Sequence, residues 1–417
     1  MMDRKAAIPD YPTVLLALLL SIYGILMVYS AGQTDAQTVV SKLWRYQTVW
    51  LCVGLVAAFL VSRASVRLLE WISWPAYLMT LALLVLLRFF GSGAGTAASS
   101  TAWLTIAGHR IGQPSELAKV TLVLMLARTL ALRREAPKTL IDLWEPALIV
   151  AVPWVFVLIQ PDLGSSIVFI GIFFAMLYWF GVPWQLLLLL ASPGISLILA
   201  FSKGMWTAWF LVLIVLIWSY KPYLWEGVFT VCANVTMGVI APLFWDRLKP
   251  YQQQRLLTFL DPSRDPRVSG YHVIQSTVAI GSGGWFGKGF TMGTQKRLAF
   301  LPEQHTDFIF AVVGEELGFF GVTLALSLFL VLFLRCTRIA SRANDTFSSL
   351  VAFGLAASWG VHVAENVGMT LNLMPIAGIP LPFFSYGGSF MLASWVAIGI
   401  LVRISGEGRG RADGLAI

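Results

Sequence analysis

The run YPTVLLALLLSIYGILMVYS at residues 11–30 decides the class of this protein. A helix needs about 20 predominantly apolar residues to cross a hydrocarbon core roughly 30 Å thick, and this run has that length. Similar runs recur along almost the whole chain, in which 58% of the residues are hydrophobic and only 12% are charged. Water cannot solvate most of such a chain. The sequence therefore predicts an integral membrane protein.

The apolar runs predict an all-α fold in a single integral membrane domain that covers residues 1–417. We predict spans near residues 11–30, 47–62, 71–89, 115–132, 144–159, 164–181, 184–200, 205–219, 225–244, 307–334, 349–371 and 386–402. All of these spans form the core except the doubtful pair at 184–219. Its halves are joined so tightly, at Ser202, Lys203 and Gly204, that a re-entrant hairpin is the alternative.

Short loops that are rich in Lys and Arg all fall on one side of this arrangement of spans. Because positive charge in short loops marks the cytoplasmic side, both termini are expected in the cytoplasm. Segments 31–46, 90–114, 245–306 and 372–385 then face the outside. The longest of them, the extracytoplasmic loop 245–306, contains Gly, Pro and aromatic residues rather than the filler of a disordered tether. Loops of this kind carry function.

Composition also excludes several kinds of protein. The net charge of +8 is explained by basic cytoplasmic loops and requires no nucleic acid. Cys52, Cys232 and Cys336 are scattered and form no C-x-x-C pair, so neither a disulfide framework nor a zinc site is indicated. The first apolar run lacks a small-residue cleavage site, so a first span is expected rather than a cleaved signal peptide.

Ionisable residues in or beside a span are costly and need a partner, a cavity or a function. The first such cluster runs from Gln113 to Lys119. Pro114 and Ser115 suit a helix start, and Glu116 lies three residues before Lys119, on the same helix face. Two interpretations stay open. One is a self-neutralising ion pair, and the other is a cation beside helix N–H groups that binds a phosphate-bearing ligand.

Two further clusters lie at the ends of spans. In the short turn 160–166, Asp162 is placed to cap the next helix. Glu365 and Asn366 lie in the outer half of a span that is followed by the Pro- and Gly-rich segment 375–389. This segment cannot form a regular helix, so its backbone is expected to line protein or water, as the wall of a cavity.

The richest cluster belongs to the outer loop and the span after it. Asp307 follows Thr306, a suitable N-cap, at the start of a long apolar helix. Compensation of the helix dipole is the structural interpretation of this carboxylate, and catalysis is the functional one. The glycine-rich run 281–289 is not a phosphate loop, because Ser282 replaces the first required Gly and Gly289 the final Ser or Thr.

Together these clusters resemble the SEDS family (shape, elongation, division and sporulation). The resemblance covers nearly the whole chain. It is most specific from Tyr251-Gln252-Gln253-Gln254-Arg255 through Phe259-Leu260-Asp261-Pro262 to Glu315-Glu316-Leu317-Gly318. The spellings Gly287-Lys288-Gly289 and Gly293-Thr294-Gln295 resemble the RodA branch of the family rather than its division branch.

The resemblance implies a peptidoglycan glycosyltransferase that polymerises lipid II into glycan strands outside the bacterial cytoplasmic membrane during cell elongation. It also implies a class B penicillin-binding protein as the partner that supplies transpeptidation. The essential carboxylate of the family corresponds to Asp307, and its functional Glu-Lys pair corresponds to Glu116 and Lys119. Because the family has ten spans, the resemblance also implies that the pair 184–219 is an insertion.

Glycan extension from an undecaprenyl-diphosphate donor needs a base for the acceptor hydroxyl and positive charge against the departing diphosphate. Asp307 fits the first role, and Lys119 with Arg110 fits the second. A divalent cation, magnesium or manganese, is a further expectation at the diphosphate, because hard oxygen ligands suit such ions. Gln275 and Glu303 are expected only to shape the acceptor site.

Some positions depart from the pattern of the family. They are Ala102, Val268, Ala377 and Phe390, and the basic residue before Gln113 is shifted by one, to Arg110. None of these changes removes the proposed base. The resemblance therefore identifies the base better than it identifies the residues that contact the diphosphate.

A lipid II flippase is the main alternative function. A transporter predicts polar residues distributed through the depth of the membrane, whereas the polar clusters of this chain gather at the outer face. A scaffold that only holds the penicillin-binding protein is a third interpretation. Loss of function on the conservative change Asp307→Asn favours the enzyme over the other two, because neither a transporter nor a scaffold needs a general base.

Overall fold

A computed structural model describes residues 10–35, 39–93, 102–106, 109–247, 269–297 and 303–412, together with Gln253, Leu257 and Phe259. Most of the predicted outer loop before residue 269 lies outside the described residues, including Asp261 of the family motif and Val268. The part of this loop that is described lies directly before the proposed base, Asp307.

Each predicted span corresponds to a helix. The helices are α1 (Tyr11–Ala31), α2 (Leu43–Ser62), α3 (Val66–Phe90), α4 (Pro114–Ala131), α5 (Trp144–Ile159), α6 (Leu163–Phe180), α7 (Trp184–Leu199), α8 (Lys203–Tyr220), α9 (Leu224–Arg247), α11 (Ser269–Ser282), α12 (Thr294–Arg297), α13 (Ile309–Ser341), α14 (Thr346–Thr370) and α15 (Gly388–Ala412). Short 3₁₀ turns, Val39–Lys42 and Ile141–Leu143, precede α2 and α5. Ten of the described helices are long and apolar enough to cross a membrane, which is the pattern of a multi-pass membrane protein.

A small antiparallel sheet was not predicted by the sequence. Its strands are β1 (Gly91–Ser92), β2 (Trp103–Ile106) and β3 (His109–Gly112), in the order β1-β2-β3. Leu104 pairs with both Gly91 and Gly112, so β2 is the central strand. The sheet connects α3 to α4 and leads directly into the helix that carries the Glu-Lys pair.

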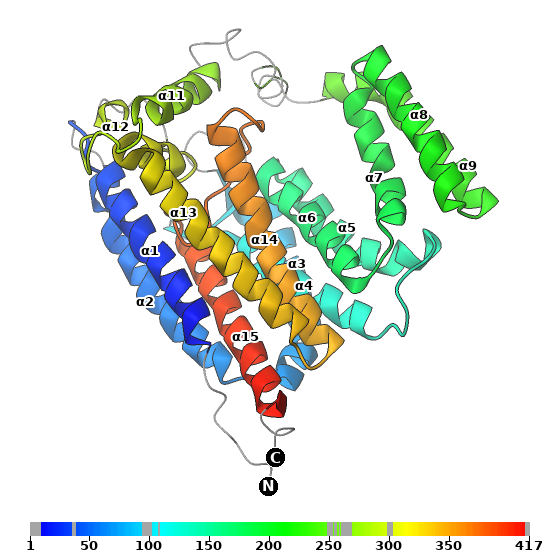
Figure 1. Ribbon diagram of the computed structural model, residues 1–417, viewed down its shortest axis with the longest axis horizontal. Coiled ribbons are helices and arrows are strands. Elements are labelled where there is room, and N and C mark those ends of the chain that lie inside the picture. The colour runs from blue at the N-terminus through cyan, green and yellow to red at the C-terminus, as the bar shows by residue number, and fades with distance from the viewer. Residues whose placement is uncertain are drawn as a thin grey trace.

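Helix α14 is the central helix of the bundle. It packs against α4, α6 and α13, and 67% of its most apolar window is buried inside the protein (Figure 1). A second strong contact joins α2 to α15. Polar side chains are costly where a helix faces lipid. The buried polar side chains of α14 therefore contact protein groups inside the bundle.

Helices α7, α8 and α9 form a unit of their own beside the main bundle (Figure 1). Asn234 of α9 is buried at their centre and donates to Ser192 Oγ over 2.8 Å, while Ser196 Oγ donates to Asn234 O over 2.9 Å. Trp209 Nε1 donates to Asn234 Oδ1 over 3.2 Å. The pair predicted at 184–219 thus forms two helices joined to a third, and its origin as an insertion stays a prediction.

Helix α13 is broken at Gly318, whose backbone φ of 62° and ψ of −157° are not helical. Lys288 N and Gly289 N donate to Glu315 O and Glu316 O over 3.0 Å each, and Phe319 N donates to Gly284 O over 2.9 Å. The glycine-rich run 281–289 therefore inserts its backbone into the break. The glycines of this run, which do not match a phosphate loop, thus have a structural role in the break.

Candidate active site

Asp307 lies in a turn before α13 and not inside a helix. The helix begins only at Ile309, and its N-cap residue, Phe308, makes no side-chain capping bond. The prediction that Thr306 caps this helix is wrong, because Thr306 Oγ1 instead donates to Glu303 O over 3.2 Å. Asp307 N also donates to Glu303 O, over 3.1 Å. The carboxylate is therefore carried by a tight turn, outside the regular helix.

Three successive carbonyls hold this turn against the segment between α14 and α15. Tyr386 N donates to His305 O over 2.9 Å, and Ser385 Oγ donates to Thr306 O over 2.6 Å. Asn366 Nδ2 of α14 donates to Asp307 O over 2.9 Å. These bonds come from a part of the chain more than fifty residues away in sequence, so the turn is fixed by tertiary contacts.

The central part of the Pro- and Gly-rich segment 375–389, residues 379–385, is buried or half-buried in protein, as predicted for backbone that cannot face lipid. Ile379, Leu381 and Phe384 are each at most 2% exposed. Gly378 lies beside the carboxylate of Asp307, because a Cβ atom at Gly378 would lie 3.3 Å from Asp307 Oδ2. This segment therefore forms one wall of the candidate site.

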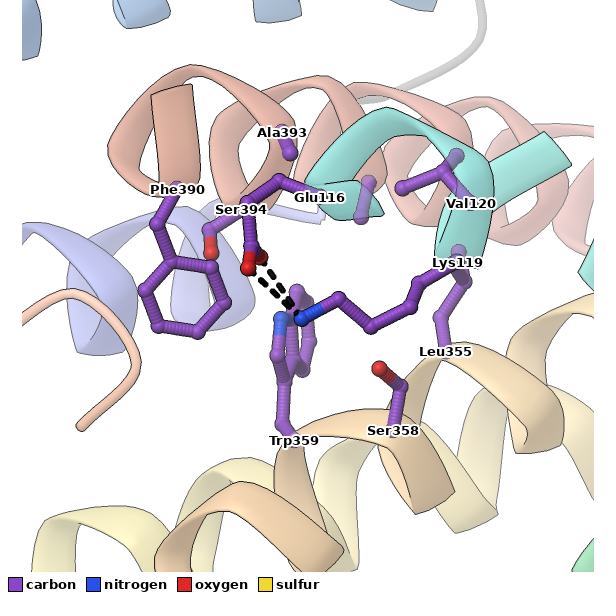
Figure 2. Close-up of a pocket in the computed structure, with 10 residues that line it drawn as sticks. Glu116, Lys119, Val120, Leu355, Ser358, Trp359, Phe390, Ala393 and Ser394 are labelled. Carbon is purple, nitrogen blue, oxygen red and sulfur yellow. Dashed lines mark hydrogen bonds and ion pairs between the residues drawn. The ribbon is translucent and has the colours of Figure 1, made fainter. Parts of the chain in front are cut away.

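Glu116 and Lys119 form an ion pair at the start of α4, which was the first of the two interpretations of this cluster. Lys119 Nζ donates to Glu116 Oε1 over 2.8 Å, and both side chains are 3% exposed (Figure 2). Lys119 Nζ also lies 2.8 Å from His362 Nε2 and 5.3 Å from the centre of the Phe390 ring. The Lys119 ammonium is thus already paired with a carboxylate, and it also makes a cation–π contact with Phe390.

A small cavity adjoins this pair between α4, α14 and α15 (Figure 2). Ser358 and Ser394 bring hydroxyls to it, and Trp359 and Phe390 bring aromatic rings. The Ser394 hydroxyl is buried and has no hydrogen-bond partner within the described protein. A polar lining with an unsatisfied hydroxyl suits a water molecule or a ligand oxygen.

His362 joins the ion pair to the wall of the site. Its Nδ1 lies 3.0 Å from Pro380 O, and since a carbonyl only accepts, Nδ1 carries the proton. Nε2 is then the acceptor for Lys119. One helical turn later, Asn366 Nδ2 donates to Ile379 O over 2.7 Å. The adjacent carbonyls of Ile379 and Pro380 are thus both bonded to α14. One bond is next to Lys119, through His362, and the other is next to Asp307, through Asn366.

The other predicted site residues are Glu303, Gln275 and Arg110, and the structure gives fewer contacts for them. Glu303 lies in the same turn as Asp307, with backbone φ of 49°, and its Oε2 is 3.7 Å from His305 Nε2. Burial lowers the pKa of His305, although the Glu303 carboxylate acts to raise it. Gln275 is half-buried on α11, which packs against α13. Arg110 lies on β3, paired with Thr105, and its side chain lies outside what the structure describes.

The predicted cap at Asp162 is confirmed, since its Oδ1 accepts a hydrogen bond from Ser165 N over 3.0 Å. Asp162 Oδ2 also accepts from Gln113 Nε2 over 3.1 Å. This bond ties the start of α4 to the start of α6. Among the described residues, no three His, Cys, Asp or Glu side chains converge to hold a metal ion.

Sequence reasoning missed His362 and Gln47. Gln47 of α2 is fully buried, donates from Nε2 to Ser385 O over 2.9 Å and accepts at Oε1 from Gly387 N over 3.1 Å. The signal was available, because each is a polar residue within an apolar run. The spacing of four between His362 and Asn366 also indicates one shared helix face.

The chain is similar to known proteins over almost its whole length. A family model described as cell cycle protein, for FtsW, RodA and SpoVE, matches residues 11–223 and 202–410. The chain is 33% identical to "Peptidoglycan glycosyltransferase RodA" of Treponema pallidum (strain Nichols), over 95% of this chain and 97% of that protein. It is also 33% identical to "Probable peptidoglycan glycosyltransferase FtsW" of Geobacter sp. (strain M18), over 97% of this chain and 98% of that protein.

A solved structure is similar over almost the whole length. It comes from work on "structural coordination of polymerization and crosslinking by a peptidoglycan synthase complex". The TM-score is 0.71 and the identity 31%, with 96% of this chain and 98% of that chain covered. The likeness therefore extends over the helical bundle as a whole.

Proposed function

Because this chain belongs to the FtsW, RodA and SpoVE family of cell cycle proteins, we propose that it is a peptidoglycan glycosyltransferase that polymerises lipid II during cell elongation. The names of the curated relatives support glycosyl transfer. Relatives with RodA and with FtsW names both match, so the elongation role and the RodA branch rest on the spellings at 287–289 and 293–295.

One observation carries the proposal for the base. Asp307 sits in a turn whose carbonyls are tied by Asn366 and Ser385 to the segment 375–389. A general base must be held in a fixed position relative to the hydroxyl from which it takes the proton. A carboxylate that only compensated a helix dipole would need no such support from a distant part of the chain.

In the proposed step, the Asp307 carboxylate accepts the proton of an acceptor sugar hydroxyl. The hydroxyl oxygen forms a bond to the anomeric carbon of the donor sugar, and the bond from this carbon to the diphosphate oxygen breaks. Undecaprenyl diphosphate leaves with the electron pair. Glu303, in the same turn, and Gln275, on the neighbouring α11, shape the acceptor side.

Positive charge on the diphosphate side comes from Lys119 and Arg110 in this proposal. Lys119 is buried and bonded to Glu116 and His362, so it binds a phosphate oxygen only by exchanging one of these contacts. A divalent cation, magnesium or manganese, would add charge there when bound. Since the described side chains offer no group of three ligands for it, no step is assigned to it.

The test is polymerisation of labelled lipid II by the purified protein, alone and with a class B penicillin-binding protein as the proposed partner. We expect polymer from the native chain and a loss of at least about 10²-fold for Asp307→Asn, the lower end of what general-base catalysis contributes. Asp345→Asn is the matched control, because Asp345 is a carboxylate at the start of α14 and Asn also caps helices.

Equal polymer from the native chain and Asp307→Asn would remove Asp307 as the base. No polymer from either, with a folded complex that moves lipid II across vesicle membranes, would favour the flippase. A chelator arm tests the cation: polymer that is lost with chelator and restored by magnesium or manganese supports it, and unchanged polymer removes it.

A further inference from the structure

Asn366 contributes both amide hydrogens to the candidate site. It is fully buried, and its Nδ2 donates to Asp307 O over 2.9 Å and to Ile379 O over 2.7 Å. Both partners are carbonyl oxygens, which only accept, so the side chain must supply two donors at one nitrogen. Among uncharged side chains, only Asn and Gln have such a group. The bonds therefore specify the residue type at this position.

We propose that Asn366 is a positioning residue for glycosyl transfer, which sets where the Asp307 carboxylate stands. The inference rests on the proposed function of Asp307 as the base. The bond to Asp307 O holds the residue whose side chain accepts the proton. Misplacement of a catalytic group by about 1 Å can cost 10²-fold in rate, so this bond acts on turnover.

The second bond of Asn366 holds the wall beside the same carboxylate. Ile379 follows Gly378, whose backbone φ is 71° and whose Cβ, were it present, would lie 3.3 Å from Asp307 Oδ2. One amide thus fixes both the residue that bears the carboxylate and the backbone that borders it. Asn366 thus shares the support of this turn with Ser385 and Tyr386, and in addition it binds the turn and the wall through the same nitrogen.

The Oδ1 atom of Asn366 is buried and has no hydrogen-bond partner within the described protein. Leaving a buried acceptor unsatisfied is unfavourable, so a side chain selected only for stability would not need this arrangement. The two donated bonds, both directed at the Asp307 side of the site, are what the residue contributes. Positions that combine such a cost with a directed contact are typical of functional sites.

The variant Asn366→Leu keeps the number and branching of the side-chain heavy atoms and removes both donors without adding charge. We expect kcat for polymerisation of lipid II to fall about 10²-fold, with KM changed by less than about two-fold, because the substrate is bound but the base is misplaced. The acid limb of the pH–rate profile should also shift, since the carboxylate meets a different environment. Asn366→Gln, which retains the amide, should recover part of the loss.

Asn234→Leu is the matched control. Asn234 is likewise fully buried in a span and also donates two hydrogen bonds from Nδ2, but it lies in the separate unit α7–α9. We expect it to lower the unfolding midpoint with kcat and the pH profile unchanged. If Asn366→Leu does not fold, Asn366→Ser, which keeps one donor, is measured in the same way.

The positioning role is overturned if the folded Asn366 variants retain native kcat and pH profile, or if they lose activity only in proportion to folded protein, as expected of Asn234→Leu. The two variants distinguish failure of this inference from failure of the proposed function. An active Asp307→Asn removes the base itself. An inactive Asp307→Asn together with a fully active Asn366→Leu removes only the positioning role.

Discussion

At the scale of single residues, Glu116 and Lys119 contact each other within one helix, and Lys119 also contacts residues of two other helices. Their spacing of three brings them together on one helix face. The contacts of Lys119 with His362 and Phe390 come from α14 and α15, far along the chain. A buried ion pair is supported in this way because each charge has lost its water and needs further partners.

Removing one member of this pair leaves the other charge buried without compensation. We expect Lys119→Met or Glu116→Gln to destabilise the protein by about 3–5 kcal/mol. The double variant Lys119→Met with Glu116→Leu should be less destabilised than the sum of the two single changes. Unfolding midpoints in detergent, combined as a double-mutant cycle, measure this coupling.

An exposed pair with the same spacing serves as the control. Lys138 and Glu135 are also three residues apart, with side chains 73% and 75% exposed. Lys138→Met should leave the unfolding midpoint unchanged, because water solvates the remaining charge. A Lys119→Met variant as stable as the native protein would contradict the importance of the buried pair.

The break in α13 is the main feature at the scale of elements. Glu315 accepts hydrogen bonds at Oε1 from Thr294 Oγ1 and from Gln295 N, over 3.0 Å each, and Lys288 Nζ lies 2.7 Å from the same oxygen. The fully buried Lys296 forms an ion pair with Glu316. The described residues 281–297 are therefore locked to the helix that follows Asp307.

Gly318→Ala tests this lock. Its φ of 62° and ψ of −157° lie in a region that is essentially restricted to Gly and cost Ala about 1–3 kcal/mol, and an added Cβ would lie 2.4 Å from Gly287 N. We expect a lower unfolding midpoint and faster proteolysis in the loop 281–297. Gly360→Ala in α14 is the control, because an added Cβ there meets nothing within 4 Å. Equal proteolysis of the two variants would exclude the lock.

At the scale of the whole molecule, the two ends of the main bundle carry different parts of the chain. Helix α1 begins and α15 ends at the same end, and α11 and α12 lie at the opposite end (Figure 1). The basic loop between α4 and α5 was predicted to be cytoplasmic, and the loop with α11 was predicted to be outside. The orientation of the termini stays a prediction from loop charge.

Cysteine labelling in intact cells checks this orientation. In a variant whose native cysteines are replaced by Ala, we expect a membrane-impermeant maleimide to label Ser282→Cys and to leave Glu135→Cys unlabelled. Both positions are exposed, so access alone does not distinguish them. Both should react after permeabilisation. The reverse pattern in intact cells would place the proposed active site in the cytoplasm.

The candidate site was predictable only in part. Asp307, Glu116 and Lys119 were singled out because charged residues beside apolar runs need an explanation. Their links to each other, through His362 and Asn366, depend on which face of α14 meets which neighbour. Composition does not distinguish a helix face that meets protein from one that meets lipid, since both are apolar. The turn at Asp307 was likewise mistaken for a helix start.

By itself, the sequence determined the helices, because backbone groups in lipid must be satisfied within each span and apolar length alone marks such spans. It also determined the shared helix face of Glu116 and Lys119 and the Asp162 cap, which depend only on local spacing. Only the tertiary structure decided the break at Gly318 and the position of Asp307. Both depend on hydrogen bonds between segments distant in sequence, and no local pattern specifies such partners.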